Sequence, residues 1–211
     1  MYTNGFMGFF YKFSDWFVKL AYINILWILF SLFGLIVIGF FPATFAMFSV
    51  IRRVLNKEDL SIFKAFLKSY TGDFLKSNLI GWFIILVFSI LYFDLTIIEA
   101  TENDFFQFFQ YPLLIIGFLF FATVLYVIPT YIHYDLKLFE LFKNSFVIMI
   151  VNPLNTITMI STIFVIYFVS YMIPGIIPFF SGSLLTLFLM MAALRSFQKI
   201  EDSKDRLETK A

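Results

Sequence analysis

The chain has no cysteine and a single histidine among its 211 residues. Disulfide bonds and thiolate metal sites are therefore excluded, and no cluster of histidines can hold a metal ion. The net charge of +1 gives no electrostatic basis for binding nucleic acid. The chain also lacks a glycine-rich phosphate loop, a Ser–His–Asp order and a metalloprotease helix. We expect no enzymatic activity, no catalytic residue, no metal ligand and no cofactor.

Charge is missing from long stretches of a chain that is 61% hydrophobic. No Asp, Glu, Lys or Arg occurs within residues 20–51, 77–93, 105–134 or 144–194. All 15 basic and all 14 acidic residues lie before, between or after these runs. An ion in hydrocarbon costs at least about 3 kcal/mol, so this separation indicates an integral membrane protein. The length leaves room for a single membrane domain over residues 1–211.

The uncharged runs predict an all-α, polytopic membrane protein with about five transmembrane helices. A helical crossing needs about 20 apolar residues, so the last run must hold two crossings. The prolines at 174 and 178 mark the turn between them. The expected spans are about 20–41, 77–93, 112–132, 153–173 and 176–194, with a charged tail at 195–211.

Basic residues alternate between the loops and predict the orientation. The loop after the first span is rich in Lys and Arg, whereas the loop after the second contains Asp94, Glu99, Glu102 and Asp104 and no base. Since basic loops stay inside, we expect a multi-pass protein of the plasma membrane with a cytoplasmic C-terminus and the N-terminus outside. Lys12 and Lys19 argue against this N-terminal placement. In the alternative, residues 20–51 form a tight re-entrant pair and the N-terminus is inside.

Two loop segments, at about 59–72 and 135–148, predict cytoplasmic interfacial amphipathic helices. Apolar residues recur there at helical spacing with lysines beside them, as in helices that lie in the headgroup region. Such a helix either fixes the tilt of the spans or docks a partner. The residues expected to dock a partner or lie in the interface are Leu60, Phe63, Leu67, Tyr70, Phe139 and Phe142. The residues expected to contact lipid phosphate are Arg52, Arg53, Lys57, Lys64 and Lys68.

The two amphipathic segments also align with each other. Residues 59–70 match residues 135–146 without gaps, and Asp, Leu, Phe, Phe and Ser coincide. A proline occurs before each segment, at Pro42 and Pro129. This pattern predicts a repeated unit of span, proline, interfacial helix and span. Chance matching between two amphipathic helices is the alternative.

Polar side chains within the spans are few. Asn155, Thr158 and Thr162 share one helix face, so we expect them to bond to neighbouring helices, at about 1 kcal/mol for each bond. A polar path for a sugar, bordered also by Asn24, is the alternative. Pro42 predicts a kink or break of the first span at 41–43.

The segment Gly39–Arg52, GFFPATFAMFSVIR, resembles the hallmark of the YesL-like family, also called DUF624. Further matches are HYDL at 133–136, NPL at 152–154 and PGIIPFFSG at 174–182. The resemblance implies a small bacterial membrane protein with no established activity, encoded beside sugar ABC importers. The motif positions, expected to be structural, are Gly39, Pro42, Thr44, His133, Asp135, Asn152, Pro153, Pro174, Gly175 and Pro178.

These expectations lead to three hypotheses. The first is a non-enzymatic accessory or regulatory partner of a carbohydrate ABC importer, which the resemblance implies. The second is a small carrier or channel for a sugar-like solute. The third is a membrane sensor or scaffold whose lysines hold anionic lipid. The expected partners are the phospholipid bilayer and the importer subunits, with a homo-oligomer left open.

Overall fold

The computed structural model describes residues 6–101, 107–134 and 136–208. These residues form helices joined by turns, and the described part of the chain contains no strand. Five of its helices are long and apolar enough to cross a membrane: Phe13–Phe33, Phe74–Glu99, Gln110–His133, Pro153–Met172 and Pro174–Ser203. The prediction of an all-α protein with about five membrane-spanning helices is therefore confirmed.

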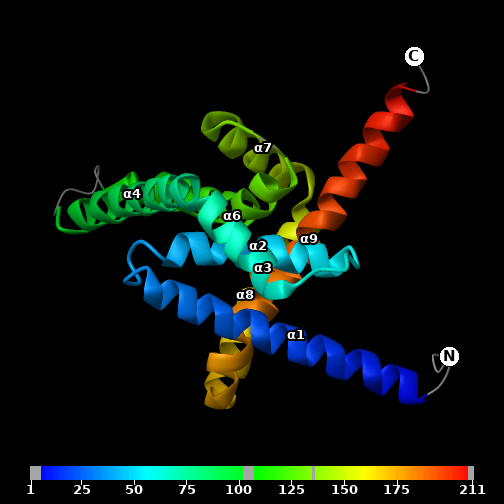
Figure 1. The fold of residues 1–211 in the computed structure, drawn as a ribbon. Helices are drawn as coiled ribbons and strands as arrows, with labels where there is room; N and C mark the ends of the chain where they lie inside the picture. Colours follow the sequence, from blue (N-terminus) through cyan, green and yellow to red (C-terminus); the bar gives the residue numbers. More distant parts are fainter. Residues whose placement is uncertain (1–5, 102–106, 135, 209–211) are drawn as a thin grey trace. The chain divides into compact units, whose positions relative to one another are not determined.

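Figure 1 shows the helices in chain order. They are α1 (Phe6–Phe33), α2 (Phe40–Leu55), α3 (Ile62–Gly72), α4 (Phe74–Glu99), α6 (Gln110–His133), α7 (Leu138–Val151), α8 (Pro153–Met172), a 3₁₀ turn (Pro174–Ile176) and α9 (Ile177–Glu208). Helices α4, α6 and α8 contain or nearly coincide with the second, third and fourth expected spans. The expected fifth span ends at residue 194, but its helix continues through most of the charged tail.

The first expected span, 20–41, differs from the observed helices. It covers the second half of α1, a turn at 34–39 and the start of α2. The chain turns there because Gly34 and Gly39 approach each other so closely that a Cβ on Gly34 would lie 2.3 Å from the Gly39 Cα. The break is thus not at 41–43. Pro42 lies in the first turn of α2. The N–H groups of a first turn have no partner within the helix, so a proline there costs no helical hydrogen bond.

The chain divides into two compact units. The first comprises Met1–Phe74 and Ser161–Met190, and the second comprises Leu75–Ile160 and Met191–Ala211. The division falls inside α8 and α9, so each of these helices contributes residues to both units.

In the first unit, α2 returns alongside α1 in the opposite direction (Figure 1). The Trp27 indole of α1 donates a hydrogen bond to the Thr44 hydroxyl of α2 over 3.1 Å. Helix α3 packs on both, and its buried Phe66 meets the Phe30 ring at 5.2 Å. Asn24 of α1 joins α9 through both ends of its amide: it donates to the Pro178 carbonyl over 2.8 Å and accepts from the Ser183 N–H over 2.9 Å.

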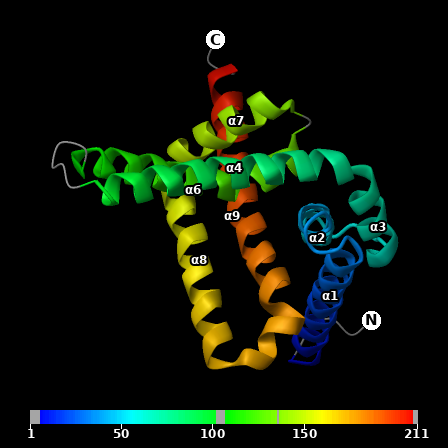
Figure 2. The same ribbon diagram turned by 90° about the vertical axis from the view of Figure 1, so that its left-hand side faces the viewer.

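In the second unit, α4 and α6 lie side by side (Figure 2), with the Phe88 and Phe120 rings 5.1 Å apart. Tyr126 of α6 shares a buried hydrogen bond of 3.0 Å with Thr156 at the start of α8. Polar side chains buried between apolar helices are stabilised by such bonds because no water is available to them in a bilayer.

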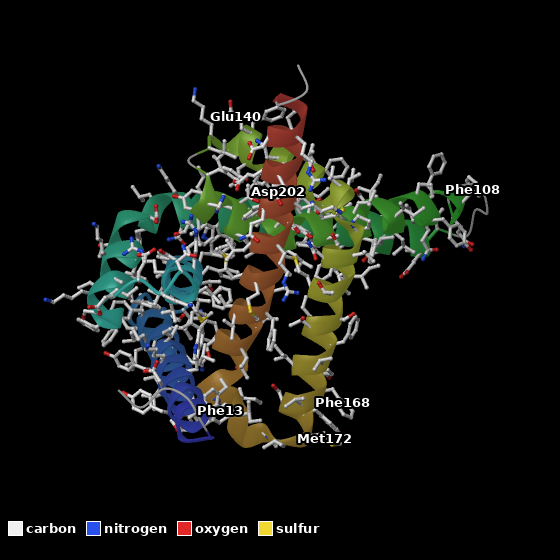
Figure 3. The ribbon with its side chains drawn as sticks, turned by 90° about the vertical axis from the view of Figure 1, so that its right-hand side faces the viewer. Phe13, Phe108, Glu140, Phe168, Met172 and Asp202 are labelled. Carbon is white, nitrogen blue, oxygen red and sulfur yellow. The ribbon has the colours of Figure 1, made fainter. Side chains whose placement is uncertain are left out.

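Large apolar side chains cover much of the outer surface of the described helices. Phe168 and Met172, for example, project outward near the end of α8 (Figure 3), and both are more than half exposed. A soluble protein of this size does not expose apolar surface on this scale. The distribution is that of helices surrounded by lipid.

Candidate functional site

The described part of the second unit contains an apolar groove beside α7, with a volume of about 740 Å³. Helices α4, α6 and α7 form its walls. The residues that line it are Leu79, Phe83, Ile116, Leu119, Phe120, Thr123, Leu138, Phe139, Phe142 and Phe146. Nine of these ten are apolar, so the groove suits a hydrocarbon or apolar helical occupant rather than a sugar.

The groove offers no unsatisfied polar group to an occupant. Its one hydroxyl, on Thr123, already donates a hydrogen bond of 2.7 Å to the Leu119 carbonyl. One wall is held in place by the edge-to-face pair of Phe83 and Phe142, whose rings are 5.0 Å apart. Phe139, by contrast with this packed pair, is 82% exposed. These aromatic side chains give the groove a large apolar contact surface.

A second hollow of about 440 Å³ adjoins the groove and shares Leu79 and Leu138 with it. Two bases, Lys76 and Lys137, line this second hollow. Together they would favour an occupant with an apolar body and an anionic or hydrogen-bond-accepting end.

The other four predicted docking residues lie on α3 or just before it, and the structure separates them. Phe63 and Leu67 are 45% and 39% exposed, although the Phe63 ring also lies 6.3 Å from the Phe30 ring. Tyr70 instead donates a hydrogen bond to the Phe30 carbonyl over 3.3 Å, with the two rings 5.0 Å apart. Burial raises the pKa of Tyr70 above its ordinary value. Leu60 lies before α3 and lines a charged crevice of the same unit.

That charged crevice, of about 440 Å³, lies between Asp15–Lys19, in the first half of α1, and the loop between α2 and α3. Asp15 and Lys19 of α1 form an ion pair at 2.7 Å across one turn. The predicted phosphate contacts lie nearby or on α3: Lys57 lines the crevice, Arg53 reaches Glu58 at 4.0 Å, Lys64 and Lys68 are exposed, and Arg52 is half-buried. Their role with lipid stays a prediction.

The comparisons with known proteins identify a family and three relatives of this chain. The family model described as "Protein of unknown function, DUF624" matches residues 20–95. YteU of Bacillus subtilis strain 168 is 34% identical over 202 residues, covering 95% of this chain and 90% of that protein. YesV of the same strain is 36% identical over 185 residues, with coverage of 87% and 89%. YesL is 32% identical over 201 residues, with coverage of 92% for both chains.

The chain belongs to the DUF624 family. The expected family resemblance is therefore confirmed. All three relatives carry the description "Uncharacterized protein", so they assign no activity. No solved structure matches the chain.

In this DUF624 chain, the hallmark segment 39–52 forms most of α2. Gly39 permits the close turn, because any Cβ there would lie 2.7 Å from the Gly34 Cα. Pro42 occupies the first turn, and Thr44 links α2 to Trp27 while donating to the Phe40 carbonyl over 2.7 Å. These three motif residues build the α1–α2 pair.

The remaining motif residues lie at helix ends. Asn152 donates its side-chain amide to the Ile148 carbonyl at the end of α7, and Pro153 begins α8. Pro174 opens the 3₁₀ turn, and Pro178 offers the carbonyl that Asn24 binds. Gly175 has open space around its Cβ position, so no close contact explains it.

His133 ends α6 and packs against Phe197 of α9, with ring centroids 4.6 Å apart. Its Nε2 lies 3.4 Å from the Glu201 carboxylate. Glu201 also accepts a hydrogen bond from Tyr134, and burial and the nearby carboxylate raise the pKa of Tyr134. The neighbouring motif position Asp135 lies outside the described residues. This arrangement ties the end of α6 to the tail of α9.

Two contacts escaped the sequence reasoning. Ser196, which is fully buried in α9, accepts a hydrogen bond of 2.8 Å from Asn155, and Ser183 anchors Asn24. Serine is common in spans, and nothing in the local sequence distinguishes these two. The sequence identifies Asn24 of α1 and Asn155 of α8 as polar residues within spans, but it does not identify their hydrogen-bond partners on α9.

Proposed function

We propose that this protein is a non-enzymatic accessory protein of the membrane that docks an apolar helix of a partner in the groove beside α7. The observation that carries the proposal is the apolar lining of that groove, to which the predicted docking residues Phe139 and Phe142 both belong. An amphipathic or transmembrane helix is a common occupant of an apolar groove. The adjoining Lys76 and Lys137 would accept an acidic residue at the end of such a helix.

As the partner we propose the permease of a carbohydrate ABC importer, which the family resemblance implies. This choice gives the proposal a defined test in the native host, because the importer subunits can be identified by mass spectrometry after cross-linking. Phospholipid acyl chains are the competing occupant of the groove, and the same experiment separates them from a protein.

The test is a pair of single substitutions on α7. Phe139→Asp places a carboxylate on the exposed aromatic of the groove, whereas Val147→Asp places the same charge on an exposed residue of α7 that does not line it. We expect Phe139→Asp to reduce copurification of the importer permease at least tenfold and Val147→Asp to leave it unchanged. Equal recovery of the permease from both variants would refute the docking groove.

A carrier for a sugar-like solute is the second proposal, and it needs a water-lined path near Asn24, Asn155 and Thr158. Two contacts weigh against it: both ends of the Asn24 amide are bonded to α9, and the Asn155 amide donates to Ser196. Cysteine scanning is clean because the native chain has no thiol. If a water-soluble thiol reagent labels cysteines at these positions in sealed vesicles, the carrier proposal gains and the docking proposal loses.

A further inference from the structure

The tip of the α1–α2 pair is made of exposed apolar residues, which are unfavourable in water. Its four central residues, Leu35, Ile36, Val37 and Ile38, are all apolar and all largely exposed, with Leu35 at 80%. A turn that emerges into water is normally rich in Gly, Asn, Asp, Ser or Pro. Two glycines flank this turn, but its centre has no polar side chain.

The backbone of the same turn needs no water. Each N–H from Gly34 through Phe40 donates to a carbonyl of the turn or of the end of α1, over distances of 2.7 to 3.3 Å. Closure on this scale requires a left-handed backbone at Leu35 and Ile36, with φ of 55° and 62°. A β-branched residue such as Ile36 rarely adopts this conformation. Internal pairing of every donor is what backbone surrounded by hydrocarbon requires.

The two arms of the pair are short. Between Lys19 and the turn, α1 rises about 21 Å, and between the turn and Arg52, α2 rises about 18 Å, at about 1.5 Å per residue. The hydrocarbon core is about 30 Å thick, and apolar segments of this length are typical of re-entrant elements. The bases at the open end, on the two helices, therefore could not stay in water if the tip reached the far surface.

The open end of the pair is charged on both helices. Asp15 and Lys19 of α1 line one crevice together with Lys57, Glu58 and Asp59 from the loop after α2. Trp16 lies in the same crevice, and tryptophan is enriched at the headgroup level. Residues 15–19 of α1 and the α2–α3 loop therefore share one level of the membrane.

We infer that the α1–α2 hairpin enters the membrane and returns to the same face, with the tip Leu35–Ile38 in contact with lipid hydrocarbon. The charge count gives independent support. With α1 and α2 returning to one face and α4, α6, α8 and α9 crossing, all 15 Lys and Arg lie on a single side. The acidic residues Asp94 and Glu99 lie on the other. This arrangement leaves four crossings, so that Phe13–Phe33, although long and apolar enough to cross, does not cross the membrane. It departs from the expectations of a first crossing at 20–41 and of an outside N-terminus, and it agrees with the re-entrant alternative.

Single cysteines test the inference, because the native chain contains none. The variants are Tyr11→Cys before the crevice, Asn56→Cys in the α2–α3 loop, Glu99→Cys at the end of α4 and Val37→Cys at the tip. Ile85→Cys, in the middle of α4, is the reference for a hydrocarbon position. A membrane-impermeant maleimide is applied to sealed right-side-out and inside-out vesicles, and then after denaturation in detergent to show that every cysteine is present and reactive.

We expect Tyr11→Cys and Asn56→Cys to react in one vesicle orientation and Glu99→Cys only in the other. Val37→Cys should behave like Ile85→Cys and react only after denaturation. Reaction at Tyr11→Cys from the side of Glu99→Cys would overturn the inference, and so would reaction at Val37→Cys from either side of sealed vesicles. The result is independent of the groove beside α7, which none of these substitutions touches.

Discussion

Helices α3 and α7 have similar sequences but different surroundings. Both begin three residues after an aspartate of the aligned segments, at Ile62 and Leu138. The aligned second phenylalanines differ: Phe66 is fully buried against Phe30, whereas Phe142 forms part of an open groove wall. A shared amphipathic pattern therefore predicts where a helix forms and which side is apolar, but not what covers that side.

The largest expected effect is on stability. Phe66→Ala should lower the free energy of unfolding by about 3 kcal/mol, because the Phe30 ring loses its packing partner and a cavity remains. Phe142→Ala should cost about 1 kcal/mol, since lipid or detergent can fill the space in an open groove. Thermal unfolding of both variants in one detergent, followed by tryptophan fluorescence, measures the difference. Equal losses would show that the two aromatics are equally enclosed.

The second comparison asks whether α3, like α7, contributes to partner binding. Replacing Phe63 and Leu67 together by Asp should reduce copurification of an importer partner about tenfold if α3 also docks it, because two carboxylates would have to be desolvated. Thr71→Asp, on the exposed end of α3, is the matched control. Unchanged copurification with the double variant would exclude α3 and leave the groove beside α7 as the docking region.

The predicted repeat of span, proline, interfacial helix and span agrees with the structure only in part. Helices α3 and α7 begin at equivalent positions of the gapless alignment, each three residues after the expected start of its segment, and α3 ends at Gly72. The prolines do not occupy equivalent places: Pro42 lies in the first turn of α2, and Pro129 lies near the end of α6. Matching of the interfacial segments therefore does not extend to the spans before them.

The hairpin and the Asn24 contacts mark the limit of prediction. A run of uncharged residues predicts that a segment lies in the membrane, but both a straight helix and a hairpin are compatible with such a run. The turn depends on the approach of Gly34 to Gly39 and on a left-handed Ile36, which local propensity disfavours. Asn24 binds a carbonyl 154 positions away, and such a partner follows only from the tertiary fold.

The third comparison concerns charge. Neutralising Lys57, Lys64 and Lys68 together by Gln should reduce retention of anionic phospholipid severalfold at low salt, with a smaller difference at high salt. Lys137, just before α7, and Lys143, within it, flank Glu140, so their replacement by Gln should matter less. Mass spectrometry of the lipids that copurify with each variant measures both effects. A larger loss from the α7 pair would place the anionic lipid beside the groove instead.

The smallest effect separates Tyr70 of α3 from its aligned counterpart, Phe146 of α7. Tyr70→Phe removes the hydrogen bond to the Phe30 carbonyl and should cost about 0.5–1 kcal/mol of stability, whereas Phe146→Tyr should be nearly neutral. Because burial raises the pKa of Tyr70 above 10.0, the folded state disfavours the phenolate. The contribution of Tyr70 is then complete below pH 10 and is lost as the pH rises through the folded-state pKa. Unfolding midpoints of the native chain and Tyr70→Phe should therefore converge at high pH, and a constant gap between them would show that the hydroxyl is not enclosed.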